Sequence, residues 1–216
     1  RIRLPDDVRD GAVEVTVRLA GAKGRCGGGV TLIIAACVVA VLAGCVPADP
    51  GGVTTGRILP EFSLVNWDGR RITRETLRDK RTVMAFTYAK CELACPILTS
   101  QLTSLDGSIE SPPDVVYLHV SVNPADDTSE EIHRHFTAHG IDPEKDTRWL
   151  FARGEEADIH RLLERFGVKV EKKRVADTFL IEHTIQVWVV GRDGRLVRMF
   201  DSYLWDVDEM KRALGS

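Results

Sequence analysis

The stretch TVMAFTYAKCELACPIL, residues 82–98, decides the fold. Its first seven residues are rich in β-branched and apolar side chains, which is typical of a buried strand. Pro96 suits the first turn of a helix, where no backbone donor is lost, and the apolar residues that follow recur at helical spacing. Cys91 and Cys95 lie between the two elements. The segment therefore predicts a strand and a helix joined by a turn that carries two thiols.

Strands and helices alternate on either side of this segment. Before it, residues 62–66 and 71–73 flank Asp68-Gly69 and predict an N-terminal hairpin. After it, the patterns predict strands over 115–122, 149–151, 184–190 and 196–200, and helices that follow Thr128 and cover 159–166 and 207–214. Such alternation implies a sheet with parallel members and helices on both faces. We therefore expect an α/β, thioredoxin-like sheet of four or five strands with flanking helices, in which residues 167–182 form either an extra hairpin or a loop.

Composition and charge exclude several classes of protein. The chain has 216 residues, a net charge of −3 and 6% aromatic residues, which argues against a basic nucleic-acid-binding protein. The most apolar run, VTLIIAACVVAVLA over residues 30–43, is shorter than the roughly 20 residues that a bilayer span needs. A polytopic membrane protein is therefore excluded.

Residues 1–45 have the pattern of an export signal. Basic residues precede the apolar run, and the run ends in Leu-Ala-Gly-Cys45, which resembles the signal of a bacterial lipoprotein. We expect 1–44 to be a signal region, 45–57 to be a lipidated Cys45 with a flexible tether, and 58–216 to be the thioredoxin-like domain. The alternatives are a buried core helix and an uncleaved anchor. Residues 1–16 are too acidic for a signal, and we expect them to reflect a mis-called start.

The remaining cysteines indicate chemistry. Without the signal and Cys45, the exported domain keeps only Cys91 and Cys95, which is too few for a disulfide scaffold. The pair either reacts or forms one small clip. A helix N-terminus favours thiolates, and soft sulfur ligands select Cu(I) but also suit zinc. The best candidate for a third ligand is His183, at the corner before strand 184–190 where thioredoxins have a cis-proline.

The sequence resembles the Sco/SenC family of copper-binding, thioredoxin-like proteins. The matching stretches, within residues 56–214, are FTYAKCELACP (86–96), SVNPADDTSEE (121–131) and EHTIQVWVVGRDGRLV (182–197). The resemblance implies a membrane-tethered protein on the outer face of a bacterial cell membrane, facing the periplasm or the cell exterior. It also implies that Cys91, Cys95 and His183 bind copper, which is delivered to the copper A site of cytochrome c oxidase.

The chain departs from the family pattern at three places. Glu92 replaces the usual proline, Asn123 replaces an aspartate, and Glu182 and Thr184 flank the histidine in place of aspartate and serine. All three ligands are retained, so the departures bear on the partner surface and the redox potential rather than on copper binding. Asp127 belongs to the Asp-Thr pair of the family pattern, and we expect it near the site but not as a ligand.

Two further functions compete with the copper carrier. A thiol–disulfide oxidoreductase that keeps exported or oxidase cysteines reduced would use Cys91 and Cys95 as a redox pair but would not need His183. A thiol peroxidase is disfavoured, because Tyr88 stands where the peroxidase motif has threonine. Three further histidines follow a capping box in a charged segment, and we expect a solvated helix face there: His133, His135 and His139.

Overall fold

The structure, a computed structural model, describes residues 52–53, 55–109, 114–175 and 178–215. Residues Pro47–Ser216 make up one compact unit. The predicted signal region, Cys45 and most of the tether lie outside the described residues. In the part of the chain that is described, no helix combines the length and the apolar character that crossing a bilayer requires.

The unit is built on one large, mostly antiparallel sheet. Its eight strands are ordered β1-β10-β9-β4-β5-β6-β2-β3, and only the pairs β4–β5 and β5–β6 are parallel. The strands are β1 (Gly52–Val53), β2 (Ser63–Asn66), β3 (Arg71–Thr73), β4 (Arg81–Thr87), β5 (Val115–Ser121), β6 (Trp149–Arg153), β9 (Val187–Val190) and β10 (Leu196–Phe200). The expected four or five strands were too few, because the N-terminal hairpin and β1 extend the same sheet at its two edges.

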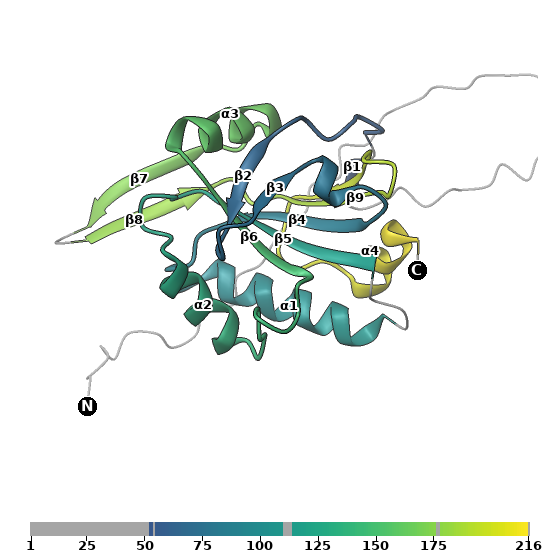
Figure 1. Cartoon of the computed structure of the whole chain (residues 1–216), viewed down its shortest axis with the longest axis horizontal. Helices are drawn as coiled ribbons and strands as arrows, with labels where there is room; N and C mark the ends of the chain where they lie inside the picture. Colours follow the sequence, from purple (N-terminus) through teal and green to yellow (C-terminus); the bar gives the residue numbers. More distant parts are fainter. Residues whose placement is uncertain (1–51, 54, 110–113, 176–177, 216) are drawn as a thin grey trace, which may run out of the picture. The chain divides into compact units, whose positions relative to one another are not determined.

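Helices cover both faces of this sheet, as expected from the alternating pattern. The helices are α1 (Ala94–Ser108), α2 (Ser129–Ala138), α3 (Glu156–Phe166) and α4 (Val207–Leu214), with a short 3-10 turn η1 (Glu75–Leu77). A hydrophobic core lies on each face of the sheet, and alternate residues of β4 contribute to the two cores. Val83 and Ala85 pack with α1, α2 and α4, whereas Met84 and Phe86 pack with α3. Figure 1 shows α1 and α2 on the side of the sheet away from α3. The strand that carries the thiol turn is therefore the centre of the structure.

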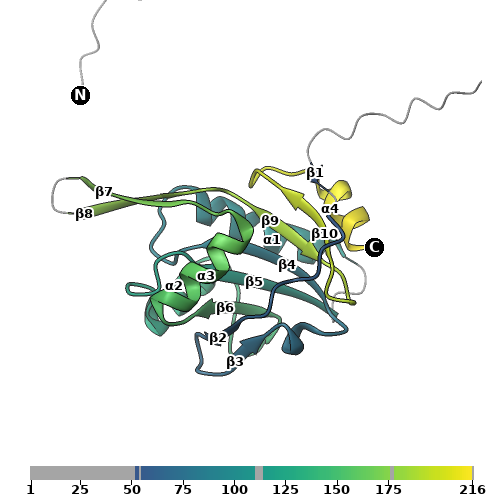
Figure 2. The same ribbon diagram turned by 90° about the horizontal axis from the view of Figure 1, so that it is seen from above.

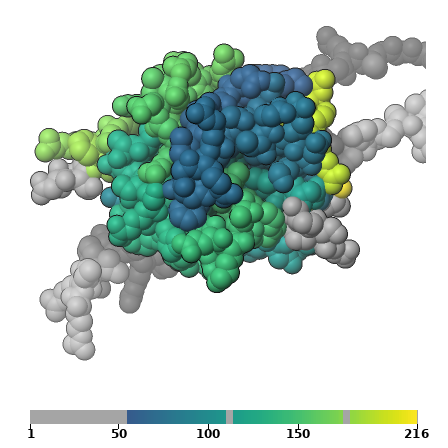
Figure 3. All heavy atoms as spheres, in the orientation of Figure 1, coloured from purple at the N-terminus to yellow at the C-terminus, as the bar shows by residue number. Residues whose placement is uncertain are grey.

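For residues 167–182 the sequence predicted either an extra hairpin or a loop, and the structure has a hairpin there. Strands β7 (Val170–Val175) and β8 (Thr178–His183) pair antiparallel in a separate two-stranded sheet. We call this hairpin the arm. In Figures 1 and 2 it extends from the body beside α3, and its outer part also projects in the space-filling view of Figure 3.

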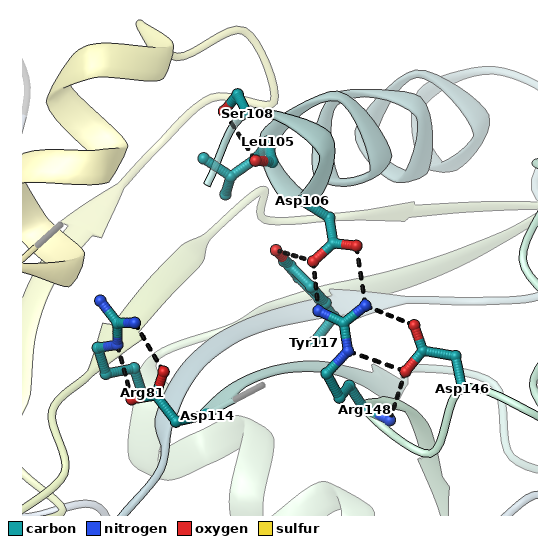
Figure 4. Close-up of polar contacts among 8 residues, drawn as sticks. All are labelled: Arg81, Leu105, Asp106, Ser108, Asp114, Tyr117, Asp146 and Arg148. Carbon is teal, nitrogen blue, oxygen red and sulfur yellow. Dashed lines mark hydrogen bonds and ion pairs between the residues drawn. The ribbon is translucent and has the colours of Figure 1, made fainter. Parts of the chain in front are cut away.

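Ion pairs hold the far end of α1 to the sheet. The guanidinium of Arg148 donates to both carboxylate oxygens of Asp106, at 2.5 and 2.9 Å, and also contacts Asp146. The hydroxyl of Tyr117 donates to the same Asp106 carboxylate across 3.0 Å. Figure 4 shows this network beside the separate Arg81–Asp114 pair. Because α1 carries Cys95 in its first turn, the network fixes the helix that positions the thiol.

Candidate metal centre

Cys91 and Cys95 are free thiols at the carboxyl end of β4. Helix α1 begins at Ala94, so Cys95 lies in its first turn while Cys91 lies in the turn before the helix. The backbone N–H of Cys95 donates to the Cys91 sulfur across 3.4 Å, and the backbone N–H of Cys91 donates to the Tyr88 carbonyl across 3.3 Å.

The two thiols differ in acidity. A hydrogen bond from the Cys95 thiol is the main cause that lowers the pKa of Cys91 to about 5, although partial burial opposes it. The same hydrogen bond and deep burial raise the pKa of Cys95 far above its ordinary value. Cys91 is half-buried and Cys95 is buried. The pair therefore combines one accessible thiolate with one buried thiol.

His183 ends β8 and is half-buried. Its ring meets the ring of Tyr88 edge-on, with 6.3 Å between the centroids. Nδ1 lies 3.1 Å from the Thr184 carbonyl, so Nδ1 carries the proton and Nε2 keeps its lone pair. Burial lowers the pKa of the imidazole. The ring is therefore neutral at pH 7 and has the form that binds metal ions.

Cys91 and His183 line the same hollow. It has a volume of about 560 Å³ and is lined by residues 90–94 and 179–183, together with Tyr88 and Ile185. We call it the trough. Among the described residues, no three histidine, cysteine, aspartate or glutamate side chains are arranged to hold a metal ion together. The structure thus brings the two cysteines together and places His183 on the same trough, without closing the three into one centre.

Asp127 is hydrogen-bonded to the backbone of the segment that leads from β4 to Cys91. This buried residue follows β5, and its carboxylate accepts hydrogen bonds from the backbone N–H of Ala89 at 2.8 Å and from the Ser121 hydroxyl at 2.5 Å. Burial raises the pKa of Asp127 to about 6. The sequence pattern indicated that Asp127 lies near the site. It did not reveal Ser121, because a serine in a strand gives no signal of its partner.

The expectation that His133, His135 and His139 form a solvated helix face was wrong for His135. Its side chain is buried and Nε2 lies 2.8 Å from the Thr99 hydroxyl, which donates to the Cys95 carbonyl across 3.0 Å. His119 on β5 is buried near it, with 6.0 Å between their rings. Burial lowers the pKa of His135 to about 4. His135 therefore belongs to the core beneath the first turn of α1 and not to a solvated face.

The donor set fits a soft metal ion better than a hard one. Two cysteine sulfurs and a neutral imidazole are ligands that suit Cu(I) and zinc, whereas magnesium and calcium prefer oxygen ligands. If these residues hold a metal, Cys91 would supply a thiolate, Cys95 would lose its proton, and His183 would supply Nε2. The trough gives such an ion access from solvent.

A central β4, an α1 that begins at paired thiols and flanking helices define a thioredoxin-like protein with a reactive dithiol. Residues 52–215 match the model of the SCO1/SenC family, and the chain belongs to this family. It is similar to the mitochondrial SCO1 homolog 1 of Arabidopsis thaliana, with 26% identity over 152 residues, which covers 69% of this chain and 43% of that protein. The SCO1 homolog of Bacillus subtilis is 26% identical over 143 residues, which covers 65% of this chain and 72% of the relative.

Solved structures confirm the fold. Arabidopsis thaliana ScoI with copper bound has a TM-score of 0.62 and 24% identity, and the match covers 73% of this chain and 96% of that one. BsSco, described as a member of the Sco family of cytochrome c oxidase assembly proteins, has a TM-score of 0.62 and 21% identity, with 76% and 94% covered. At these identities the likeness establishes the thioredoxin-like architecture.

Proposed function

We propose that this protein is a membrane-tethered copper carrier that binds copper through Cys91, Cys95 and His183. The observation that carries the proposal is the trough, which is lined by both an accessible thiolate and a neutral imidazole. The recipient we propose is the copper A site of cytochrome c oxidase or of a related respiratory oxidase. Support comes from membership of the SCO1/SenC family and from relatives described with copper bound.

The chain's own residues give binding a defined order. Cys91 is already a thiolate at neutral pH and is the more accessible sulfur, so it is the first ligand. Cys95 must release its proton to become the second, and its hydrogen bond to Cys91 is then lost. His183 must move toward the sulfurs, because among the described residues the three side chains do not already form one metal-binding group. As the last residue of β8, it can do so by a change at the end of the arm, without movement of the main sheet.

The lipidated Cys45 supplies the proposed tether. A diacylglycerol on this residue would anchor the chain at the outer face of the bacterial cell membrane, facing the periplasm or the exterior. Incorporation of labelled palmitate into the full chain, and its loss in Cys45→Ala, tests the anchor. If the wild-type chain takes up no label, the tether is removed from the proposal.

Copper binding is tested on residues 47–216 with both thiols reduced. The measurement is a titration with Cu(I) against a competing chelator, made on the wild type, on His183→Ala and on His160→Ala. His160 is the matched control, since its side chain is 70% exposed on α3 and does not line the trough. We expect one tightly bound copper that His183→Ala weakens and His160→Ala leaves unchanged. Equal affinity in all three proteins would remove His183 from the site.

The asymmetry of the thiols favours a second candidate, a thiol–disulfide oxidoreductase. The Cys91 thiolate would attack a substrate disulfide and release one substrate thiolate, leaving a mixed disulfide. Cys95, once deprotonated, would then attack the Cys91 sulfur, release the second substrate thiolate and leave a Cys91–Cys95 disulfide. Reduction of insulin by the reduced protein in the absence of copper, at the same rate in His183→Ala, would favour this function over the carrier.

A further inference from the structure

Exposed apolar side chains gather around the trough. Leu93 is 73% exposed, Phe179 is 54% exposed and Leu180 is 38% exposed, and all three line it. Leu93 belongs to the cysteine turn and the other two belong to β8, so the patch is formed by segments far apart in the sequence. Apolar side chains that cluster in this way around a hollow mark a surface that another molecule covers.

The backbone of β8 has an outer edge as well as the edge that pairs with β7. Among the described strands, β8 has no neighbour on that outer side. The N–H of Thr184 donates to the Lys169 carbonyl, so this N–H faces the β7 side, one residue beyond the Val170–His183 pair of the register. In an antiparallel pair this direction alternates from residue to residue. The N–H and C=O groups of Phe179, Ile181 and His183 therefore point away from β7.

Two observations place this outer edge in the trough. The hydroxyl of Tyr88, a residue that lines the trough, donates to the Ile181 carbonyl across 3.4 Å. In addition, five consecutive residues, Phe179–His183, line the trough. Neighbouring side chains of a strand point to opposite faces, so a hollow lined by all five must run along the edge of the strand.

We propose that the outer edge of β8 receives an extended segment of a partner protein, which adds to the arm as a third strand and passes Cys91. This inference rests on the proposed function for the nature of the partner, which is a protein whose segment carries the thiols that accept copper. In strand addition, backbone hydrogen bonds supply affinity, and pockets beside the edge select the side chains. Here Leu93 and Phe179 supply the apolar contacts.

Two other occupants fit the trough less well. A lipid surface offers no hydrogen bonds from its acyl chains to the outward-pointing N–H and C=O groups of β8. A second copy of this chain would have to bring its own β8 edge, which is walled by its own residues 90–94. Two such edges meet only if both cysteine turns move aside.

The test uses the full chain in detergent with Cys91→Ser and Cys95→Ser, so that docking is measured apart from thiol and copper chemistry. The probe is a fluorescein-labelled peptide of nine alternating threonine and valine residues with a lysine at each end. Its affinity is measured by fluorescence anisotropy. A control peptide has the same side chains and a methyl group on every threonine and valine nitrogen, which removes the donors that a strand needs.

We expect saturable binding that Phe179→Ser or Leu93→Ser weakens by about ten-fold and that methylation of the peptide abolishes. Leu204→Ser is the matched control, since Leu204 is 64% exposed and does not line the trough. It should change the affinity by less than about two-fold. Hydrogen exchange at the amides of Phe179, Ile181 and His183 should slow when the peptide binds.

Equal binding of the methylated peptide, or unchanged exchange at these amides, would overturn the proposal. Slowed exchange on dimerisation without peptide would assign the edge to a second copy. Loss of binding to vesicles of dioleoyl phosphatidylcholine and phosphatidylglycerol in Phe179→Ser would assign it to a membrane. Both of these results would also overturn the proposal. If peptide docking holds while the wild-type chain binds no copper, the docking edge stands and only the carrier function fails.

Discussion

The backbone N–H of Cys95 donates to the sulfur of Cys91 across 3.4 Å. The hydrogen bond joins the first turn of α1 to the turn that precedes it. Because the N–H donates to the sulfur at a helix N-terminus, it stabilises the thiolate form of Cys91. Because the Cys95 thiol also bonds to this sulfur, the two cysteines cannot be equally acidic. Much of the expected chemistry follows from this asymmetry.

The first prediction concerns the acidity of Cys91. The rate at which iodoacetamide alkylates Cys91 should rise through an inflection near the pKa of about 5. Cys95→Ala removes the thiol donor and should move the inflection up by about 2 pH units or more, toward the ordinary pKa of ~8.5. Cys95→Ser keeps a donor and should move it less. An inflection that is the same in all three proteins would contradict the assigned cause.

The second prediction concerns protons released on copper binding. Above pH 6 Cys91 has lost its proton and Cys95 has kept its own, and the pKa of His183 is lowered, so binding both sulfurs as thiolates releases one proton. The Cu(I) dissociation constant should therefore fall about ten-fold per pH unit between about pH 6.5 and 8.5. Chelator competition at three pH values measures the slope. A fall of about a hundred-fold per unit would mean that both thiols start protonated.

The third prediction concerns acid stability. The pKa of buried His135 is lowered from 6.5 to about 4, so between these values the unfolded chain binds more protons than the folded chain. Stability is therefore lost as the pH falls from about 6.5 toward 4. His135→Gln can still donate to Thr99 but cannot be protonated. It should reduce the loss of stability between pH 7 and pH 5 by about 2 kcal/mol.

Urea unfolding at pH 7, 6 and 5 measures this difference, with His160→Gln as the control. The buried His119, whose pKa is also lowered by burial, remains in both variants, so part of the acid sensitivity should persist. If His135→Gln loses as much stability on acidification as the wild type, His135 is not the neutral core residue that the structure describes.

The sequence predicted the centre of the fold because its signals there are strong. Residues 82–88 have few polar side chains at either odd or even positions, as a strand that is covered on both faces of its sheet requires. Strand β4 is such a strand, since six of its seven residues are buried. The strand predicted over 184–190 is β9, which spans only Val187–Val190 and pairs antiparallel with β4. At one edge the predicted hairpin of 62–66 and 71–73 was confirmed as β2 and β3. At the other edge β1 was not predicted, because its two residues are too few for a period to be read.

The sequence predicted only those residues of the candidate site whose side-chain type is itself evidence of a chemical role. Cys91 and Cys95 stand out in a sequence because few other residues supply thiolates. His135 did not, because its neighbours Glu130, Glu131 and Arg134 indicate a solvated helix. Its burial depends on Thr99 of α1 offering a hydroxyl at the right place. The sequence did not decide between a hairpin and a loop for the arm, because the consecutive charged residues of β7 show no alternation that is typical of a strand. Its partner strand, β8, follows it in the chain.

The fourth prediction concerns the support of α1. Arg148→Met should destabilise the protein by about 2 kcal/mol, because it leaves the carboxylates of Asp106 and Asp146 without their shared guanidinium. Arg165→Met is the control, since Arg165 is exposed in the last turn of α3. Denaturant unfolding measures both. A loss in Arg148→Met no larger than that in Arg165→Met would show that the network in Figure 4 does not stabilise the fold.

The most direct test of the copper site is X-ray absorption on the Cu(I)-loaded protein, which counts the sulfur and nitrogen atoms bound to the metal. Our account predicts two sulfurs and one imidazole nitrogen in the wild type and in His160→Ala, and loss of the nitrogen in His183→Ala. A wild-type spectrum with sulfur ligands alone, unchanged in His183→Ala, would contradict it.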